Sequence, residues 1–395
     1  MKQIIKSILD TDIYKLSMQN FVIQHYPDVE CEYTFSNRDK SMIFNDEAFK
    51  MIKKQINMMS KLKLTDEEYD FLKEKFKYLP VSYRQYLAAY RFNPEQVYIT
   101  HEKNGELNIN ISGFWRDTIL WEVPLMAIIS EVYFKVMDKD WSMDGQIELI
   151  NSKGKTLSDA GASLADFGTR RRRDFSVQDM VVRELKKYSV FVGTSNPYLS
   201  MKHDVRCVGT LAHEIISGVA ALESLNHPNK VVMKKWQQTY SGDLGTMLPD
   251  TFGIDSFLKD FSLEDSKLWD GTRWDSGSEY TYTDKMIAHY KKLNIDPTTK
   301  IIVYSNGLDI DRSLKIVDYC KGKIRCSMGI GTFLTSDFSK KSNKCEKSKP
   351  MNMVIKLTSA NGIPCVKLSD DAIKAIGDPT MVETMKYIHI NNYKK

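Results

Sequence analysis

The sequence contains no long hydrophobic run. Its 395 residues are 42% hydrophobic, yet no apolar stretch approaches the roughly 20 residues that a membrane helix needs. The richest stretch, residues 118–137, contains Glu122, Glu131 and Lys135 and therefore predicts a buried core helix. Residues 1–10 are too short and too often interrupted by charged side chains for an export signal. We therefore expect a cytoplasmic protein that does not enter a membrane.

Paired cysteines and a large excess of one charge are also lacking. The six cysteines show neither a CxxC pair nor the spacing of a Cys/His metal site, which predicts free thiols. The net charge of +5 comes from 56 Lys and Arg against 51 Asp and Glu; it suits anionic substrates without indicating a nucleic-acid binder. Ordinary composition excludes collagen and extended disorder. At about 100–200 residues per domain, the length predicts two folded units, or one large α/β unit with an appendage.

The first 135 residues predict a mixed α+β unit. Apolar residues alternate over residues 30–37, as in a half-buried strand, and residues 45–92 have helical periodicity. Residues 97–100 and 106–112 flank a Lys-Asn-Gly turn and predict a β-hairpin. The antiparallel component of the fold is therefore expected in this part of the chain.

From about residue 140, short apolar segments alternate with helical patterns. Repeated β-loop-α units of this length predict a parallel sheet, open or closed into a barrel. The expected strands cover residues 191–193, 241–248, 301–304 and 325–328, and the expected helices cover residues 176–188, 210–225, 254–262, 283–293 and 309–319.

The end of the chain predicts a second hairpin. Strand patterns over residues 353–358 and 366–369 flank an Asn-Gly turn, and we expect this hairpin to pair with the first unit. The preceding residues 339–350 are rich in lysine and predict a surface loop, either a lid over a nucleotide or a solvated segment.

Polar, glycine-containing loops end several of the expected strands, and a further one, at residues 166–173, follows no long apolar run and leads into a helix. In a parallel α/β barrel such loops form the active site, and small residues let backbone N–H groups approach a phosphate. The alternative is that these glycines are ordinary turn residues. The loops are DFGTRRRR at residues 166–173, GTSN at 193–196, GTRWDSG at 271–277, SNGLD at 305–309 and GIGT at 329–332.

Charged residues in and beside these loops suggest individual roles. Arg170 and Arg273 can clamp a phosphate or carboxylate through two hydrogen bonds. Asp250, Asp275 and Asp309 can hold ribose hydroxyls or Mg²⁺. The run of four arginines can instead form a solvated face or a nucleic-acid patch, although it lacks the interleaved aromatic residues that stack on bases.

A single histidine, His213, stands at the start of a helical pattern after Gly209-Thr210. Such a residue can simply pack or cap the helix. A neutral imidazole in a loop between strand and helix can also attack phosphorus, and the adjacent Glu214 can tune its basicity. The other six histidines show no paired spacing, so we do not expect a histidine-based metal site.

Taken together and in order, these loops resemble the nicotinate phosphoribosyltransferase family, of the bacterial and fungal kind with about 400 residues, over essentially the whole chain. Several matching motifs in register are far more specific than any one of them. The matching stretches are residues 9–16 (LDTDIYKL), 92–97 (FNPEQV), 120–125 (LWEVPL), 166–172 (DFGTRRR), 191–196 (FVGTSN), 209–214 (GTLAHE), 275–277 (DSG), 329–332 (GIGT) and 354–357 (VIKL).

The resemblance implies a type II phosphoribosyltransferase fold of the α/β class. One expected domain is an irregular, incomplete (β/α) barrel over residues 136–349. The other is an α+β domain built from both ends of the chain, residues 1–135 plus 350–395. A homodimer with a shared active site, in which a neighbouring subunit supplies the stacking Tyr14, is also implied.

The family's reaction joins nicotinate to 5-phosphoribosyl 1-pyrophosphate, giving nicotinate mononucleotide and pyrophosphate in NAD biosynthesis. The resemblance implies that ATP is a co-substrate, that its hydrolysis is coupled through a phosphohistidine, and that Mg²⁺ arrives with substrate phosphates rather than in a dedicated protein site. Nucleic acid and membranes are not expected partners. The implied residues are His213, Asp250 and Asp275 for catalysis; Tyr14, Phe167, Arg170, Thr194 and Ser195 for nicotinate; and Arg38, Arg273, Gly307, Asp309, Gly329, Gly331 and Thr332 for phosphates.

Ser195 favours nicotinate over nicotinamide as the substrate. Related nicotinamide enzymes carry an aspartate at the matching place, where it accepts a hydrogen bond from the amide. A serine hydroxyl can donate to a carboxylate that an aspartate would repel. Two other functions compete: a quinolinate phosphoribosyltransferase, which needs a pocket for two carboxylates and is typically shorter, and a binding protein without turnover, which would be expected to have lost Arg273, Asp275 or His213.

Overall fold

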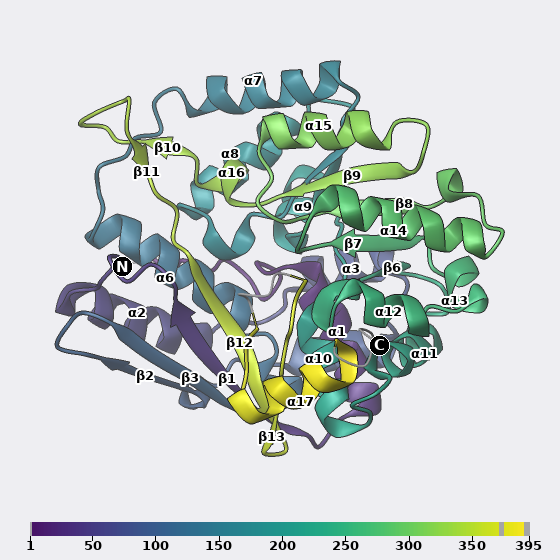
Figure 1. Cartoon of the computed structure of the whole chain (residues 1–395). Coiled ribbons are helices and arrows are strands. Elements are labelled where there is room, and N and C mark those ends of the chain that lie inside the picture. The colour runs from purple at the N-terminus through teal and green to yellow at the C-terminus, as the bar shows by residue number, and fades with distance from the viewer. Residues whose placement is uncertain (1, 371–374, 391–395) are drawn as a thin grey trace.

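Two sheets organise the chain. The structure is a computed structural model and describes residues 2–370 and 375–390; the remaining residues of the predicted C-terminal stretch, 371–374 and 391–395, lie outside the described residues. Figure 1 shows an antiparallel sheet at the lower left and a parallel sheet with its helices at the upper right. The α/β class predicted from the sequence is confirmed.

The antiparallel sheet combines both ends of the chain. Its order is β13-β12-β1-β3-β2, so the C-terminal strand β12 lies beside the N-terminal strand β1, with Cys31 opposite Ala360. The expected pairing of the last hairpin with the first unit is therefore confirmed. The strands are β1 (Glu30–Asn37), β2 (Val97–His101), β3 (Leu107–Phe114), β12 (Met353–Ala360) and β13 (Ile363–Pro364).

The second strand of the C-terminal hairpin differs from the prediction. The strand after the Asn-Gly turn is β13 and not residues 366–369, whose alternating pattern was misleading. These residues leave the sheet, and the backbone N–H groups of Leu368 and Ser369 donate to the Thr251 carbonyl instead. The alternation arises because one side of this segment packs inward while Lys367 points elsewhere.

Helices cover the antiparallel sheet. The predicted buried helix is confirmed as α6, which packs against α2 and β12, and the Thr65–Glu68 pair forms a capping box at the start of α3. The elements of this part are α1 (Ile13–His25), α2 (Asp46–Met59), α3 (Asp66–Lys75), α4 (Val81–Ala89), η1 (Pro94–Gln96), α5 (Trp115–Thr118) and α6 (Glu122–Val136).

The parallel sheet is open. Its order is β5-β4-β9-β8-β7-β6, and within the described residues its outer strands β5 and β6 do not pair with each other, so the barrel is incomplete, as predicted. The predicted strand over residues 241–248 shrinks to two residues. The strands are β4 (Leu164–Asp166), β5 (Phe191–Thr194), β6 (Thr246–Met247), β7 (Gly271–Trp274), β8 (Ile301–Tyr304) and β9 (Arg325–Ile330).

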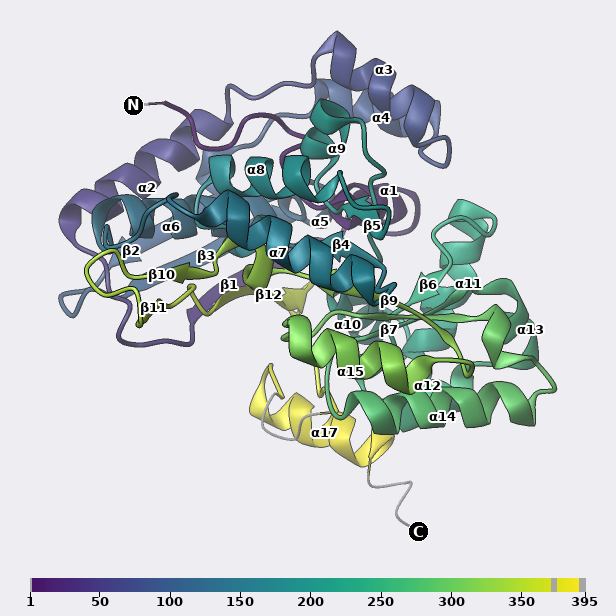
Figure 2. The same cartoon turned by 90° about the horizontal axis from the view of Figure 1, so that it is seen from above.

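Helices flank this sheet, and Figure 2 shows α7 and α8 side by side along one part of it and α14 and α15 along another. α10 packs on β12 and so joins the two sheets. The remaining elements are α7 (Gln146–Asp159), η2 (Thr169–Arg171), α8 (Phe175–Leu185), α9 (Pro197–His203), α10 (His213–Leu222), α11 (Pro228–Tyr240), η3 (Pro249–Thr251), α12 (Ile254–Asp260), α13 (Leu263–Leu268), α14 (Glu279–Lys292), η4 (Pro297–Thr299), α15 (Ile310–Cys320), α16 (Thr332–Thr335), β10 (Phe338–Ser339), β11 (Lys347–Ser348) and α17 (Pro379–His389).

The arginine run is largely internal. Arg172 is fully buried and donates to both carboxylate oxygens of Asp10, at 2.6 and 2.9 Å. Arg173 is also buried, with its guanidinium 3.6 Å from the centre of the Phe134 ring and its Nη1 donating to Ser348. A solvated face is therefore the wrong interpretation for these two residues, which tie the loop after β4 to the N-terminal segment and to β11.

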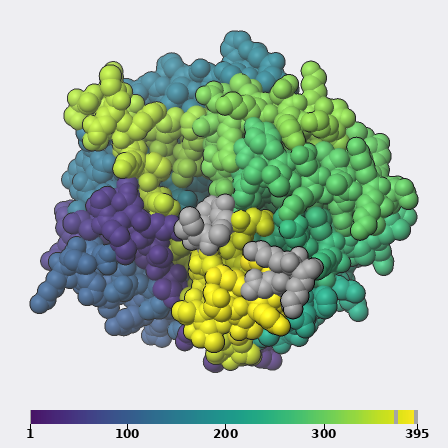
Figure 3. Space-filling view, in the orientation of Figure 1, coloured from purple at the N-terminus to yellow at the C-terminus, as the bar shows by residue number. Residues whose placement is uncertain are grey.

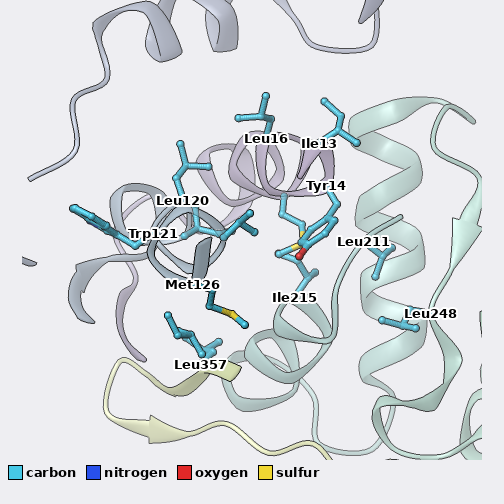
Figure 4. Packing of buried hydrophobic residues seen from close by; sticks show 14 of the residues in the cluster. Ile13, Tyr14, Leu16, Leu120, Trp121, Met126, Leu211, Ile215, Leu248 and Leu357 are labelled. Atoms are coloured by element: carbon cyan, nitrogen blue, oxygen red, sulfur yellow. The ribbon is translucent and has the colours of Figure 1, made fainter. Parts of the chain in front are cut away.

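One hydrophobic core connects the two sheets. Figure 4 shows Tyr14 of α1, Met126 of α6, Ile215 of α10 and Leu357 of β12 in the same cluster. In the space-filling view the yellow C-terminal part lies between purple N-terminal and green central surface (Figure 3). None of the helices within residues 2–370 and 375–390 is long and apolar enough to span a membrane. The predicted domain boundaries at 135/136 and 349/350 stay a prediction.

Candidate active site

A cavity of about 400 Å³ lies where the parallel sheet faces the antiparallel one. The chain enters its lining directly after β4, β7, β8 and β9, because the carboxyl ends of parallel strands share one edge and their loops converge there. β12 and the segment that follows β13 close the other side. The predicted site residues in the lining are Tyr14, Arg38, Phe167, Arg170, His213, Arg273, Asp275, Gly307, Gly329, Gly331 and Thr332.

Four predicted site residues do not line the cavity that the described residues form. Asp309 is exposed, and its side chain caps α15 by accepting a hydrogen bond from the Arg312 N–H. The Thr194 hydroxyl donates to Asp166 at 2.8 Å, which holds the end of β5 to the end of β4. Ser195 and Asp250 lie directly behind cavity residues and are described below. The lysine-rich residues 339–350 include the end of β10, the turn that follows it and β11, and they also stay out of the lining.

His213 is the first residue of α10 and is 7% exposed. Its Nδ1 lies 2.9 Å from the hydroxyl of Thr251, while Nε2 lies 3.0 Å from Asp275 Oδ2 and 2.8 Å from Lys367 Nζ. Burial and the Lys367 ammonium lower the pKa of His213 to about 4. The positive end of the helix dipole acts in the same direction. The imidazole is therefore neutral at pH 7, and its Nε2 is the nitrogen beside the cavity-lining groups.

Glu214 does not contact this imidazole, contrary to the suggestion that it tunes the histidine. It points into the core, where its carboxylate accepts hydrogen bonds from Tyr33 at 2.6 Å and Trp115 at 2.9 Å and pairs with Lys15 at 2.5 Å. Lys15 also lies 2.6 Å from Glu122. Glu214 therefore anchors the start of α10 to the antiparallel sheet and to α1.

Asp250 and Asp275 approach the histidine from the sheet edge. Burial would raise the pKa of Asp275, but the positive charges of Arg273 and Lys367 oppose it, and the pKa lies well below its ordinary value. Asp250 accepts a hydrogen bond from Ser276 at 2.5 Å, while its Oδ1 is buried, lies 3.6 Å from His213 Nε2 and has no hydrogen-bond partner among the described residues. The two carboxylates and the imidazole offer ligand atoms within 4.8 Å of one another.

Aromatic rings and one guanidinium mark the other end of the cavity. Tyr14 and Phe167 both line it, and Tyr14 comes from the same chain. A Cβ on Gly329 would lie 2.4 Å from the Phe167 ring, so the glycine leaves room for that ring. Arg170 is 40% exposed, and its guanidinium lies 3.7 Å from Asp12 and 3.5 Å from Glu122. This end can hold a flat ring that carries a negative charge.

Ser195 reaches this end only through a neighbour. Its hydroxyl donates to Asp12 Oδ1 at 2.6 Å, and the other oxygen of Asp12 is the one that faces Arg170. Burial raises the pKa of Asp12 against the opposing effect of Arg170. Ser195 therefore affects the guanidinium by holding Asp12, rather than by direct exposure to the cavity.

Cations line the remaining wall. Arg38 and Arg273 were predicted from the sequence; Arg273 Nη1 donates to Thr210 at 2.8 Å, and its Nε has no hydrogen-bond partner within the part of the chain described. Lys356 and Lys367 also line the cavity and were missed, as was Glu122. Lys356 belongs to the recognised VIKL motif, so a signal for it existed. Lys367 sits in a segment that the sequence predicts as a strand, and nothing there pointed to the histidine.

Comparison with known proteins identifies the family. The model of the nicotinate phosphoribosyltransferase (NAPRTase) family matches residues 162–392, and the model of its N-terminal domain matches residues 9–130. The chain belongs to the nicotinate phosphoribosyltransferase family.

Relatives match the chain over almost its full length. A nicotinate phosphoribosyltransferase of Methanosarcina mazei is 42% identical, with 97% of this chain and 98% of that protein covered. A probable nicotinate phosphoribosyltransferase of Schizosaccharomyces pombe is also 42% identical, covering 96% and 97%. The crystal structure of a putative nicotinate phosphoribosyltransferase from Saccharomyces cerevisiae superposes with a TM-score of 0.95 at 38% identity and covers 98% of both chains. The family fold is thus shared throughout.

Proposed function

We propose that this protein is a nicotinate phosphoribosyltransferase, which joins nicotinate to 5-phosphoribosyl 1-pyrophosphate in the salvage of NAD. The observation that carries this proposal is one cavity with a ring-binding end at Tyr14, Phe167 and Arg170 and a cationic wall at the other end. Full-length relatives that bear the same name support it.

The ring-binding end suits a pyridine with a single carboxylate. Each aromatic contact with the ring would contribute about 0.5–1.5 kcal/mol, and a charged hydrogen bond from Arg170 about 1.5–3 kcal/mol. The neighbouring Arg171 donates from both Nε and Nη2 to the Met353 carbonyl, and Arg172 is paired with Asp10. This leaves one guanidinium for the substrate, which favours nicotinate over the dicarboxylate quinolinate.

The cationic wall suits the phosphates at both ends of the second substrate. Arg38, Arg273 and Lys356 face the cavity and would neutralise the 5′-phosphate and the pyrophosphate. The pyridine nitrogen attacks C1′ of the ribose, the N–C1′ bond forms, and the C1′–O bond breaks with its electron pair leaving on pyrophosphate. The nitrogen lone pair is the nucleophile, so no protein base is required.

Magnesium fits the acidic side of this cavity. Asp250 Oδ1 is buried without a hydrogen-bond partner among the described residues, and Asp275 lies beside it. Mg²⁺ prefers oxygen ligands and is usually held by one or two carboxylates together with substrate phosphates. Asp250 and Asp275 would hold it, and when bound it would supply charge neutralisation on the leaving group.

Coupling to ATP belongs to the same proposal. A neutral His213 at the cavity wall is a competent acceptor of a phosphoryl group, and the low pKa of about 4 keeps it so. A shared active site in a homodimer also stays a proposal; Tyr14 already lines the cavity of its own chain, so the ring-binding end does not depend on a partner for this residue.

A substrate panel tests the function. Pyrophosphate release is measured with nicotinate, nicotinamide or quinolinate as acceptor, each with and without ATP. We expect release with nicotinate only, and faster release when ATP is present. Turnover of quinolinate would instead indicate the dicarboxylate enzyme, and absence of turnover with all three acceptors would favour a binding protein.

Replacing Ser195 with aspartate tests how the ring end recognises its substrate. The new carboxylate would stand beside that of Asp12, and two like charges in contact cost several kcal/mol. The two carboxylates would compete with the substrate for the Arg170 guanidinium. We therefore expect the KM for nicotinate to rise by about tenfold or more. Ser195→Ala, which removes the hydroxyl without adding charge, is the control and should have a smaller effect. An unchanged KM in Ser195→Asp would rule out that Ser195 affects the substrate through Asp12 and Arg170.

A further inference from the structure

The segment after β13 carries one lysine to the catalytic histidine. Residues 365–370 leave the antiparallel sheet and cross to the loops of the parallel sheet. The N–H and carbonyl of Lys367 bond to the backbone of Ile376, the next two N–H groups donate to Thr251, and the Asp370 N–H donates to the Ser276 hydroxyl. Backbone hydrogen bonds on both sides of Lys367 therefore fix the position of its Cα atom.

The ammonium of Lys367 lies beside Nε2 of His213, the nitrogen that would accept the phosphoryl group. Its Nζ lies 2.8 Å from His213 Nε2, 3.6 Å from Asp250 and 3.9 Å from Asp275, and its side chain is 14% exposed. Because Nδ1 faces the Thr251 hydroxyl, a neutral His213 with its proton on Nδ1 leaves the Nε2 lone pair for the ammonium. The resting nucleophile is thus covered by a cation.

We infer that Lys367 is a catalytic residue for phosphorylation of His213, covering the Nε2 lone pair at rest and moving its hydrogen bonds to the γ-phosphoryl oxygens when a nucleoside triphosphate arrives. The inference rests on the proposed function. An ammonium on a flexible stem makes such a shift over a short distance, and its charge opposes the negative charge that gathers around the phosphorus.

The step balances without a further reactant. The Nε2 lone pair attacks the γ-phosphorus, the N–P bond forms, and the bond from phosphorus to the β,γ-bridging oxygen breaks. Its electron pair leaves with the nucleoside diphosphate. The Nδ1 proton stays beside Thr251, and Lys367 keeps its three protons throughout.

The other cations of the cavity are placed differently. Arg273 uses Nη1 on Thr210 and holds Asp275 ionised. Burial lowers the pKa of Lys356 to about 8 against the opposing effect of Glu122, which lies at the ring end. The matched control is Lys386, a lysine of α17 that is close in the chain to Lys367, pairs with Glu383 at 2.8 Å and does not line the cavity.

The test compares Lys367→Met, Lys367→Arg and Lys386→Met with the wild-type chain. Each protein receives γ-labelled ATP with Mg²⁺, and the initial rate of acid-labile, base-stable labelling is measured. We expect Lys367→Met to slow labelling by about 100-fold or more, as for the loss of one pre-positioned donor to a reacting group. Lys367→Arg should recover part of the rate, and Lys386→Met should label like the wild type.

The outcomes separate the two proposals. An unlabelled wild-type chain would refute the phosphorylation and the role of Lys367 with it. A labelled wild type together with an equally labelled Lys367→Met would refute the role of Lys367 alone.

Discussion

Replacing His213 with alanine is expected to abolish phosphorylation of the protein by ATP. The wild-type chain should acquire label from γ-labelled ATP that is lost in acid and stable in base, because Nε2 is the neutral nitrogen at the cavity wall. Without the imidazole no acceptor is left there. Labelling should fall to background, and the gain in nicotinate mononucleotide formation that ATP provides should disappear with it.

His227→Ala is the matched control for this experiment. His227 also stands at the start of a helix, α11, and pairs with an aspartate, Asp260, but its side chain is 65% exposed and does not line the cavity. This variant should label like the wild type. Label that persists in His213→Ala would assign the phosphoryl acceptor to another residue.

The pH dependence of labelling should follow the His213 imidazole. Only its neutral form attacks, and a group with its pKa near 4 is almost entirely neutral at about pH 5, where an ordinary histidine with a pKa of about 6.5 is mostly protonated. Labelling of the wild type should therefore persist from neutral pH to about pH 5 and fall only as the pH approaches 4. A loss centred near pH 6.5 would show an unshifted imidazole.

Replacing Arg170 with methionine is expected to raise the KM for nicotinate by about 10- to 150-fold, the equivalent of losing one charged hydrogen bond. The methionine keeps the aliphatic stem and removes the guanidinium that faces the ring end. Phosphorylation of His213 involves the opposite wall and should continue. The split between a large change in KM and retained labelling would distinguish loss of the carboxylate contact from general unfolding.

Arg183→Met provides the control for this variant. Arg183 is on α8 with a side chain that is 51% exposed and pairs with Glu184 at the surface. Its removal should leave the KM for nicotinate unchanged. An unchanged KM in Arg170→Met would place the carboxylate elsewhere in the cavity.

The sequence predicted those site residues that directly follow strands. Asp275 comes directly after β7, and Gly331 and Thr332 come directly after β9; the geometry of parallel sheets brings such positions to one edge. Phe167 follows β4 in the same way, but its role was implied by the resemblance, because no strand was predicted before it. For the residues after β7 and β9, the loop pattern and the sheet topology pointed to the site, because each side chain reaches the cavity from the end of its own strand.

Residues whose position depends on distant contacts were not predictable in this way. Lys367 reaches His213 only because its segment leaves the sheet, and that departure is fixed by backbone bonds to Thr251, far away in the chain. Ser195 looked like a residue in contact with substrate, but its hydroxyl is taken by Asp12. The run of four arginines suggested that Arg172 is exposed to solvent, but this residue is buried and pairs with Asp10. Each outcome depends on a partner that no local pattern specifies.

The pairing of β1 with β12 has a consequence for how the protein matures on the ribosome. One edge of β1 pairs with β3 early in synthesis, but its other edge stays open until residues near Ala360 have emerged. At about 5–20 residues per second, that edge is exposed for many seconds, which is the interval in which unpaired strands attract chaperones. Lys367, whose side chain contacts His213, is synthesised later still. A chain that ends prematurely can therefore assemble much of the fold and still lack this lysine at the active site.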